Sequence, residues 1–161
     1  MLVCYDASEG AKAALVAAAE AFAPSAAVVA CYWQPFASSE KRFGVDIREL
    51  VQNPDDVNRR EAELAATIAE EGAELARDVG FEAEGRAVEI DGAIDQAILT
   101  HADELGAVAI VLGSRSRSSL RSLLIGSIAN EVVQRATCPV FLAPSARLAG
   151  RRRDDLARGD E

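Results

Sequence analysis

Short apolar runs alternate with longer stretches of helical periodicity along most of this chain, and this alternation restricts the possible fold more than any other feature. The runs predict buried strands, and the four intervening stretches carry apolar residues at helical spacing. The predicted strands are residues 2–5, 26–33, 82–90, 107–112 and 138–143. Alternation of this kind is typical of a mostly parallel sheet with right-handed crossovers. The sequence therefore predicts a single α/β domain: a doubly wound, five-stranded, mostly parallel sheet with helices on both faces.

Each of the first three predicted helices follows a residue that can cap it. These capping residues are Ser8, Asn53 and Asp91, whose side-chain oxygens can accept hydrogen bonds from the first free N–H groups of a helix. Pro54 also suits the first position of the second helix. The fourth helix is predicted over residues 128–136.

Composition and charge exclude several classes of protein. Half of the 161 residues are hydrophobic, which favours a packed domain over a disordered chain. The formal net charge of −9 would repel nucleic acid and anionic membranes. No apolar stretch approaches the roughly 18 residues of a membrane-spanning helix, and no secretory leader follows Met1. The sequence therefore predicts a cytoplasmic protein with no nucleic-acid and no membrane partner.

The three cysteines, Cys4, Cys31 and Cys138, lie far apart in the sequence and within apolar runs. The chain has no CxxC pair and no Cys/His spacing suited to a metal. We expect free, buried thiols in a reducing compartment, with a redox role as the alternative.

Two segments fall outside the strand–helix pattern. Residues 34–53 have no clear period, and a connection of this length in a compact domain is usually functional or mobile. Residues 145–161 are charged and nearly devoid of large apolar side chains. We expect a disordered, solvated tail there, with a partner-binding arm as the alternative. The predicted domain is therefore residues 1–144.

Residues 113–127 form the most informative loop. A predicted strand ends at Gly113, a segment rich in Gly, Ser and Arg follows, and a helix is expected near Gly126 and Ser127. Backbone N–H groups of such a loop and of the first helical turn point at an anion, with the helix dipole behind them. The loop holds three arginines and no acid, which favours a phosphate ligand. The alternative is a turn whose Gly and Ser serve only the backbone and the helix cap.

A second set of candidate residues follows the first strand. Asp6, Ala7 and Ser8 come directly after residues 2–5. Ligands of open parallel sheets bind beyond the carboxyl ends of the strands, where the strand order reverses. If the first and fourth strands are neighbours, these residues and the start of the 113–127 loop line one crevice.

The loop and its flanks resemble the universal stress protein family. Nucleotide-binding members carry Gly-x-x-Gly, nine residues, and then Gly-Ser or Gly-Thr, and Gly113, Ser116, Gly126 and Ser127 stand at those positions here. The flanking phrases that carry the likeness are residues 106–114, 125–133 and 138–140. The resemblance covers about residues 1–144. It implies an adenine nucleotide alpha hydrolase-like fold, which is a Rossmann-like three-layer sandwich.

The resemblance assigns ATP, or another adenine nucleotide, with Mg²⁺ to the crevice between the first and fourth strands. It implies that Asp6 contacts the ribose and that Tyr32 contacts the adenine. It also implies that backbone N–H groups and the Ser127 hydroxyl hold the phosphates. The candidate cofactor-binding residues are Cys4, Tyr5, Asp6, Tyr32, Leu112, Gly113, Ser116, Arg117, Gly126, Ser127 and Ile128.

The chain departs from the family pattern at Ser116, which stands where the second glycine is expected. A serine in the left-handed backbone conformation costs on the order of 1 kcal/mol, and its side chain can crowd the phosphates. Its hydroxyl can equally donate a hydrogen bond to them. Because about 1.4 kcal/mol is tenfold in affinity, strain alone would weaken ATP binding without abolishing it. The direction of the net effect stays open.

The function predicted from these features is that of a stress-response protein that binds an adenine nucleotide as a homodimeric regulatory module. The last strand is the expected dimer contact, because Val140, Phe141 and Leu142 are apolar and this strand is a sheet edge in the expected order. Family members commonly pair there. The sequence identifies no further protein partner. The alternative is a nucleotide-independent homodimeric interaction module of the same fold.

No catalytic constellation is recognisable in the sequence, so we expect no enzyme and at most slow, incidental ATP hydrolysis. There is no Ser–His–Asp set, no carboxylate pair and no Gly-Lys-Ser/Thr phosphate loop. His101, the single histidine, lies beside Asp103 and Glu104 and is expected at the surface. A phosphoacceptor receiver domain is excluded, because Asp6 has no acidic neighbour, no Asp ends the third strand and no Lys ends the fifth.

Overall fold

The computed structural model describes residues 1–23, 25–35, 53–114, 126–145, 149–150, 153–154 and 158. One sheet holds β1 (Leu2–Cys4), β2 (Ala26–Trp33), β3 (Glu82–Glu89), β4 (Ile110–Ser114) and β5 (Val140–Pro144). The strand order is β3-β2-β1-β4-β5, and each neighbouring pair is parallel. The predicted five-stranded α/β fold is therefore confirmed.

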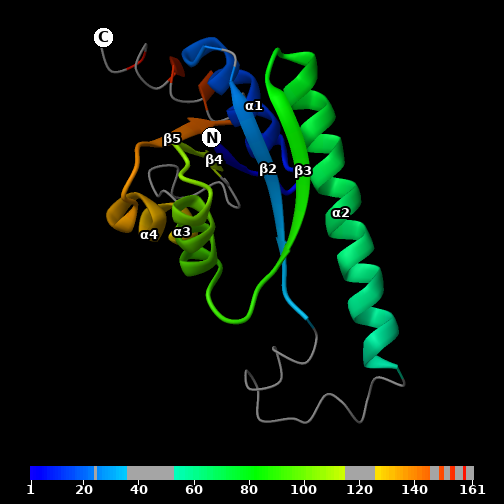
Figure 1. Cartoon of the computed structure of the whole chain (residues 1–161). Helices are drawn as coiled ribbons and strands as arrows, with labels where there is room; N and C mark the ends of the chain where they lie inside the picture. Colours follow the sequence, from blue (N-terminus) through cyan, green and yellow to red (C-terminus); the bar gives the residue numbers. More distant parts are fainter. Residues whose placement is uncertain are drawn as a thin grey trace.

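Two helices cover each face of the sheet. The helices are α1 (Glu9–Ala21), α2 (Pro54–Asp78), α3 (Ile94–Glu104) and α4 (Ser127–Arg135). One core cluster joins α1 and α2 to the sheet, and a second joins α3 and α4 to the opposite face. Figure 1 shows α2 running along β2 and β3, with α3 and α4 side by side across the sheet. The alternation of strand residues between the two clusters follows from the period-2 geometry of a strand.

The strand order reverses between β1 and β4. The chain passes from β1 to β2 and β3 on one side of β1, and then crosses to β4 and β5 on the other. The register pairs Leu2 with Ile110 and Val3 with Val111. The carboxyl ends of β1 and β4 therefore meet at the point where an open α/β sheet offers a crevice.

The α1/α2 face is built on close approach of backbones. A Cβ placed on Gly113 would lie 2.3 Å from the carbonyl carbon of Gly10 in α1. A Cβ on Gly85 of β3 would lie 2.8 Å from the carbonyl carbon and oxygen of Ala69 in α2. Glycine at these positions lets helix and strand pack with no side chain between them.

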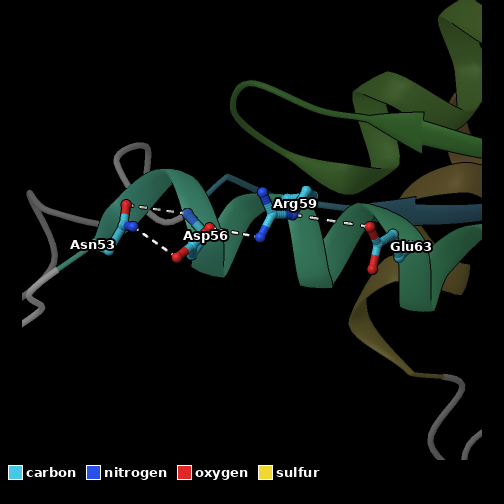
Figure 2. Close-up of polar contacts among 4 residues, drawn as sticks. All are labelled: Asn53, Asp56, Arg59 and Glu63. Atoms are coloured by element: carbon cyan, nitrogen blue, oxygen red, sulfur yellow. Dashed lines mark hydrogen bonds and ion pairs between the residues drawn. The ribbon is translucent and has the colours of Figure 1, made fainter.

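The start of α2 is held by local polar contacts instead of burial (Figure 2). The Asn53 side-chain oxygen accepts a hydrogen bond from the Asp56 N–H at 3.4 Å, and Arg59 contacts Asp56 at 2.6 Å and Glu63 at 3.9 Å. All these side chains are exposed or half-exposed, so each pair contributes little to stability. The buried residues of α2 begin only at Ala65.

Two predicted boundaries are wrong because glycines redirect the chain. Gly92, with φ of +105°, turns the backbone after Asp91, and α3 begins at Ile94 with Ala93 as a cap that lacks a side-chain hydrogen bond. After α3, the Ala107 N–H donates to the Ala102 carbonyl at 2.9 Å across Gly106, whose φ is +57°. This is the glycine-type helix ending. Residues 107–109 therefore close α3 or lead to β4, which runs over Ile110–Ser114 and not 107–112.

The two edge strands differ in charge. On β3 the exposed positions are taken by Glu82, Glu84, Arg86 and Glu89. The β5 sequence, Val-Phe-Leu-Ala-Pro, holds no charged residue, and the strand starts at Val140, two residues later than predicted. Pro139 lies directly before the strand, and its carbonyl accepts a hydrogen bond from the Ile110 N–H at 2.9 Å.

Several predictions fall on residues outside the described ranges. They concern residues 36–52 of the long connection, residues 115–125 of the loop and most of the 145–161 tail. None of the described helices combines the length and apolar character that crossing a bilayer requires. The cytoplasmic location stays a prediction.

Candidate functional site

A pocket of about 360 Å³ lies at the carboxyl ends of β1, β2 and β4. The side walls come from α3 and from the first turn of α4. Nine of the eleven candidate residues line it: Cys4, Tyr5, Asp6, Tyr32, Leu112, Gly113, Gly126, Ser127 and Ile128. Ser116 and Arg117, the other two, lie outside the described residues. The structure thus brings these nine residues to one crevice, and their role in binding stays a prediction.

The end of β1 is shaped by an unusual backbone turn. Ala7 has φ of +58°, the left-handed region that side-chain-bearing residues rarely adopt. The Asp6 carboxylate accepts a hydrogen bond from the Ser8 N–H at 3.1 Å, and the Ser8 hydroxyl accepts one from Ala11 N–H at 3.2 Å. The turn therefore caps α1 and leaves Asp6 lining the pocket.

Tyr5 lines the pocket, but its side chain extends to the opposite face. The ring lies against α2, where a Cβ on Gly72 would come within 2.6 Å of it. The hydroxyl donates to Glu71 at 2.9 Å, and Lys12 pairs with the same carboxylate oxygen at 3.0 Å. These two partners lower the pKa of Glu71, Lys12 contributing most. The Tyr5 ring thus belongs to the α1/α2 core.

The first turn of α4 opens on the pocket. Gly126 caps the helix with no side-chain hydrogen bond, and a Cβ placed on it would meet no atom of the described residues within 4 Å. The first N–H groups of a helix have no partner within the helix and carry the positive end of its dipole. Gly126, Ser127 and Ile128 therefore form a helix end of the kind that can bind an anion, and no other described residue approaches the Gly126 Cβ position.

The base of the pocket holds two thiols that are not reactive. Burial raises the pKa of Cys4 to about 12, with the Asp6 carboxylate adding to the effect and the contact with Tyr32 opposing it. Burial, and to a smaller extent Asp6, raises the pKa of Cys31 to about 11. Both groups are therefore neutral thiols near pH 7 and poor nucleophiles. All three cysteines are free, as predicted, but only Cys31 is buried, whereas Cys4 and Cys138 are partly exposed.

His101 is buried, which corrects the expectation of a surface residue. It is 8% exposed, and its Nδ1 lies 3.0 Å from the Tyr32 hydroxyl. The two rings are in an edge-to-face arrangement with centroids 6.0 Å apart. The acidic neighbours suggested solvent, yet His101 falls seven residues after Ile94 and three after Ile98, on the apolar stripe of α3. That spacing was the signal that placed it inside.

Sequence reasoning missed four residues of the pocket wall. These are Cys31, Ile94, Ile98 and Ala129. The two isoleucines were recognised as a helical stripe, but the sequence did not show that α3 crosses the end of the sheet. At the end of β4, the buried Ser114 hydroxyl has no hydrogen-bond partner within the described part of the chain.

The pocket's chemistry fits a partly apolar anion. Leu112, Ile94 and Ile98 offer apolar walls, Asp6 offers a carboxylate, and the α4 end offers N–H donors. No group of three or more His, Cys, Asp or Glu side chains suited to a metal ion occurs among residues that the structure describes.

Comparison with known proteins gives one family. The model of the universal stress protein family matches residues 1–144. A curated relative, the universal stress protein YxiE of Bacillus subtilis (strain 168), is 34% identical over 88 residues. That match spans 55% of this chain and 58% of YxiE, which is less than two thirds of the relative's length.

Solved structures give the same fold. A universal stress protein from Archaeoglobus fulgidus matches with a TM-score of 0.64 and 26% identity, over 88% of this chain and 95% of that one. A universal stress protein solved in complex with cAMP matches with a TM-score of 0.58 and 21% identity, over 90% of this chain and 95% of that one.

Proposed function

The chain belongs to the universal stress protein family, and we propose that it binds an adenine nucleotide, ATP with Mg²⁺, in the pocket between β1 and β4. The observation that carries the proposal is the first turn of α4. Its first residues line the same pocket as the apolar walls and Asp6, and among the described residues no atom lies within 4 Å of a Cβ placed on Gly126. The cAMP complex of a structural neighbour supports an adenine nucleotide as the ligand class.

Each part of the nucleotide has a chemically suited surface. The phosphates would lie at the α4 N-terminus, where N–H groups and the Ser127 hydroxyl can donate to them. The base would lie between Tyr32 and the apolar side chains of Ile94 and Ile98, and Asp6 would accept from the ribose hydroxyls. Mg²⁺ would bind through phosphate oxygens, as it does when a site supplies few carboxylates. Ser116 and Arg117 would add to the phosphate site from the loop.

The role of the bound nucleotide is regulatory in this proposal. The two thiols nearest the ligand are held neutral, with raised pKa values of about 12 and 11, so neither is an activated nucleophile. The bound nucleotide would act by changing what the protein binds. Slow hydrolysis of the bound ATP would be incidental to that role.

Thermal unfolding with ATP, ADP and AMP tests the ligand. A nucleotide that binds only the folded state raises the melting temperature as its concentration rises. We expect a concentration-dependent rise with at least one of the three in the presence of Mg²⁺. No shift at millimolar nucleotide would favour the nucleotide-independent interaction module instead.

Replacing Gly126 tests the position of the phosphates. Gly126→Val puts a branched side chain into the open space at the helix end, and should abolish ATP binding in a calorimetric titration while circular dichroism stays unchanged. Gly150→Val is the matched control, because a Cβ on Gly150 also meets no atom of the described residues within 4 Å and Gly150 is not part of the pocket.

Ser116→Gly should strengthen ATP binding by up to roughly tenfold if Ser116 only adds strain, and weaken it if the hydroxyl binds phosphate.

The second part of the proposal is a homodimer through β5. Within the described sheet this strand pairs with β4 alone and leaves an uncharged edge, whereas the exposed side chains of β3 are mostly acidic. Uncharged edges favour pairing with another strand. Val140, Phe141 and Leu142 are half-buried within one chain, and Phe141 also packs edge-to-face on Phe22 at 5.5 Å.

Charge on the β5 edge tests the dimer. Phe141→Arg, and Leu142→Lys, which leaves the contact between Phe22 and Phe141 in place, should give monomers in light scattering. Val133→Arg, at an exposed position of α4, is the control and should leave the mass unchanged. A wild-type protein that is monomeric at high micromolar concentration would contradict the dimer without touching the nucleotide proposal.

A further inference from the structure

Tyr32 is held from two sides by groups on two other elements. Its ring, near the end of β2, lines the pocket. Its hydroxyl lies 3.0 Å from Nδ1 of His101 on α3, and the Cys4 thiol of β1 is a second neighbour. Burial and the Cys4 contact raise the pKa of Tyr32, so the phenol keeps its proton. The side chain proposed to meet the base thus lies between Cys4 and His101, and its hydroxyl is within hydrogen-bond distance of His101.

His101 itself does not line the nucleotide pocket. It lines a separate groove of about 520 Å³ between the edge of β3 and α3, together with Arg86 and Glu104. Tyr32 and His101 therefore form a wall between the groove and the pocket, each facing one of them. A change at His101 can reach the pocket through its contact with Tyr32.

The environment of His101 keeps it neutral. Burial and the Arg86 guanidinium lower its pKa, while Glu104 acts in the opposite direction. Glu89 and Asp91 are the other charged groups of the groove, and Cys4 stays neutral beyond Tyr32. On the neighbouring α4, Arg135 is paired with Asp95 at 3.0 Å. A neutral imidazole has one ring nitrogen free to accept a hydrogen bond.

We propose that His101 is a positioning residue for the nucleotide site, whose neutral Nδ1 accepts the Tyr32 O–H and so fixes the tyrosine ring against the base. This inference rests on the proposed nucleotide function. When His101 takes up a proton, both ring nitrogens become donors, and Nδ1 can no longer accept from Tyr32. The Tyr32 O–H must then turn away from His101, and Nδ1–H can donate to the Tyr32 oxygen instead. We expect this reversal of the hydrogen bond to loosen the fit of the ring against the base, so that nucleotide affinity falls as His101 is protonated.

The test compares ATP affinity at pH 7.5 and pH 5.5 by calorimetry in the wild type, His101→Gln and His101→Phe, each also in a Tyr32→Phe background. The wild type should lose about fivefold more affinity at low pH than His101→Gln, since one neutral hydrogen bond contributes about 1 kcal/mol. Gln can accept from Tyr32 but does not titrate, and the comparison cancels the protonation of ATP itself. His101→Phe should bind about fivefold more weakly than His101→Gln at pH 7.5. In a Tyr32→Phe background these His101 changes should have no further effect.

A measurement without ligand checks the same contact. Because the chain holds one histidine, its ¹⁵N imidazole signals are unambiguous. We expect neutral His101 to carry its proton on Nε2 and to have a pKa below 6.5. Tyr32→Phe should change both the tautomer and the pKa of His101. An Nδ1–H form unaffected by Tyr32→Phe would overturn the inference.

The outcomes separate this inference from the function on which it rests. If all proteins bind ATP alike and show the same pH dependence, His101 does not position Tyr32 and the nucleotide proposal stands. If the wild type binds no nucleotide at either pH, the proposed function fails and the inference fails with it.

Discussion

On the α1/α2 face of the sheet, helix and strand backbones come into direct contact, whereas on the α3/α4 face side chains separate them and leave a pocket. Gly113 and Gly85 allow the first arrangement, since a Cβ at either would lie within 2.8 Å of a helix backbone. Gly126, on the second face, has no atom of the described residues within 4 Å of such a Cβ. Gly113 and Gly126 therefore line one pocket but differ in role. Gly113 allows close packing of strand on helix, and Gly126 leaves space at the end of α4.

This difference separates what stabilises the chain from what can bind. The α1/α2 face has no room for change, because close-packed interiors relax poorly when a methyl group is added. The α3/α4 face keeps space at the carboxyl ends of the strands, where a ligand can contact backbone donors. Substitutions on the two faces should therefore affect different measurements, stability on one and affinity on the other.

Gly113→Ala should show the largest effect on stability. The added Cβ would meet backbone atoms of Gly10 and Ala11 at 2.3 to 2.5 Å, and backbone cannot rotate away as a side chain can. We expect a loss of about 3 kcal/mol, or a melting temperature lower by roughly 10 °C. Gly126→Ala is the matched control and should unfold within a few degrees of the wild type. Equal melting temperatures for the two variants would refute the distinction between the faces.

Gly72→Ala should cost less. Its Cβ would meet side-chain atoms, Tyr5 Cδ1 at 2.6 Å and Val29 Cγ1 at 2.8 Å, which can shift by small rotations. The gain in helix propensity of about 1 kcal/mol offsets part of the overpacking, leaving a net loss of about 1–2 kcal/mol in chemical denaturation. ATP affinity should stay unchanged, and a large loss of affinity would show that the two faces are coupled through Tyr5.

Tyr5→Phe should have a smaller effect again. The ring and its packing remain, and only the hydrogen bond to the exposed Glu71 is lost. The lowered pKa of Glu71 adds stability that is present above its unfolded-state value and is lost as the pH falls through the folded-state value. The variant should therefore differ from the wild type less at acidic pH than at pH 7. A constant difference across a series of thermal melts would contradict this.

His101 should give the smallest effect, a pH dependence on the pocket face. Its folded-state pKa lies below the ordinary 6.5, so the unfolded chain takes up the proton first as the pH falls. Stability should therefore drop between pH 6.5 and the lowered value, and level off below it. His101→Gln should remove this component. The check is the difference in melting temperature between pH 7.5 and pH 5.5, wild type against variant.

Much of the fold could be predicted from the sequence because apolar residues recur at strand or helix spacing, and capping and turn residues stand at the ends of these segments. Ser8 and Asn53 cap their helices as expected, since each side chain stands next to the first turn. Asp91 does not, because the positive φ of Gly92 turns the chain between the aspartate and the helix. An apolar run also misplaced β4, since Ala107 completes the end of α3 through its N–H. Gly106 does mark the end of that helix in the sequence, but local composition could not show that the ending includes Ala107 or that Gly92 turns the chain.

The candidate site, too, could be predicted only in part from the sequence. Residues that follow β1 and β4 could be placed together from the rule for parallel sheets, and the loop phrase pointed to the α4 end. The direction of the Tyr5 ring and the burial of His101 could not be read with equal ease, because both depend on which helix lies above which strand. His101 shows how acidic neighbours in the sequence can hide a helical stripe that points inward.

The charged residues of β3 also have a consequence for symmetry. A sheet whose two edge strands can both pair with other copies can grow at both ends into an open filament. Here Glu82, Glu84 and Glu89, with Arg86 among them, stand at exposed positions of the β3 edge, so mostly like charges would meet if that edge met its own copy. Of the two edges of the described sheet, β5 is the one without charge. The proposed homodimer, paired through β5 around a twofold axis, would therefore close at two copies instead of growing at both ends.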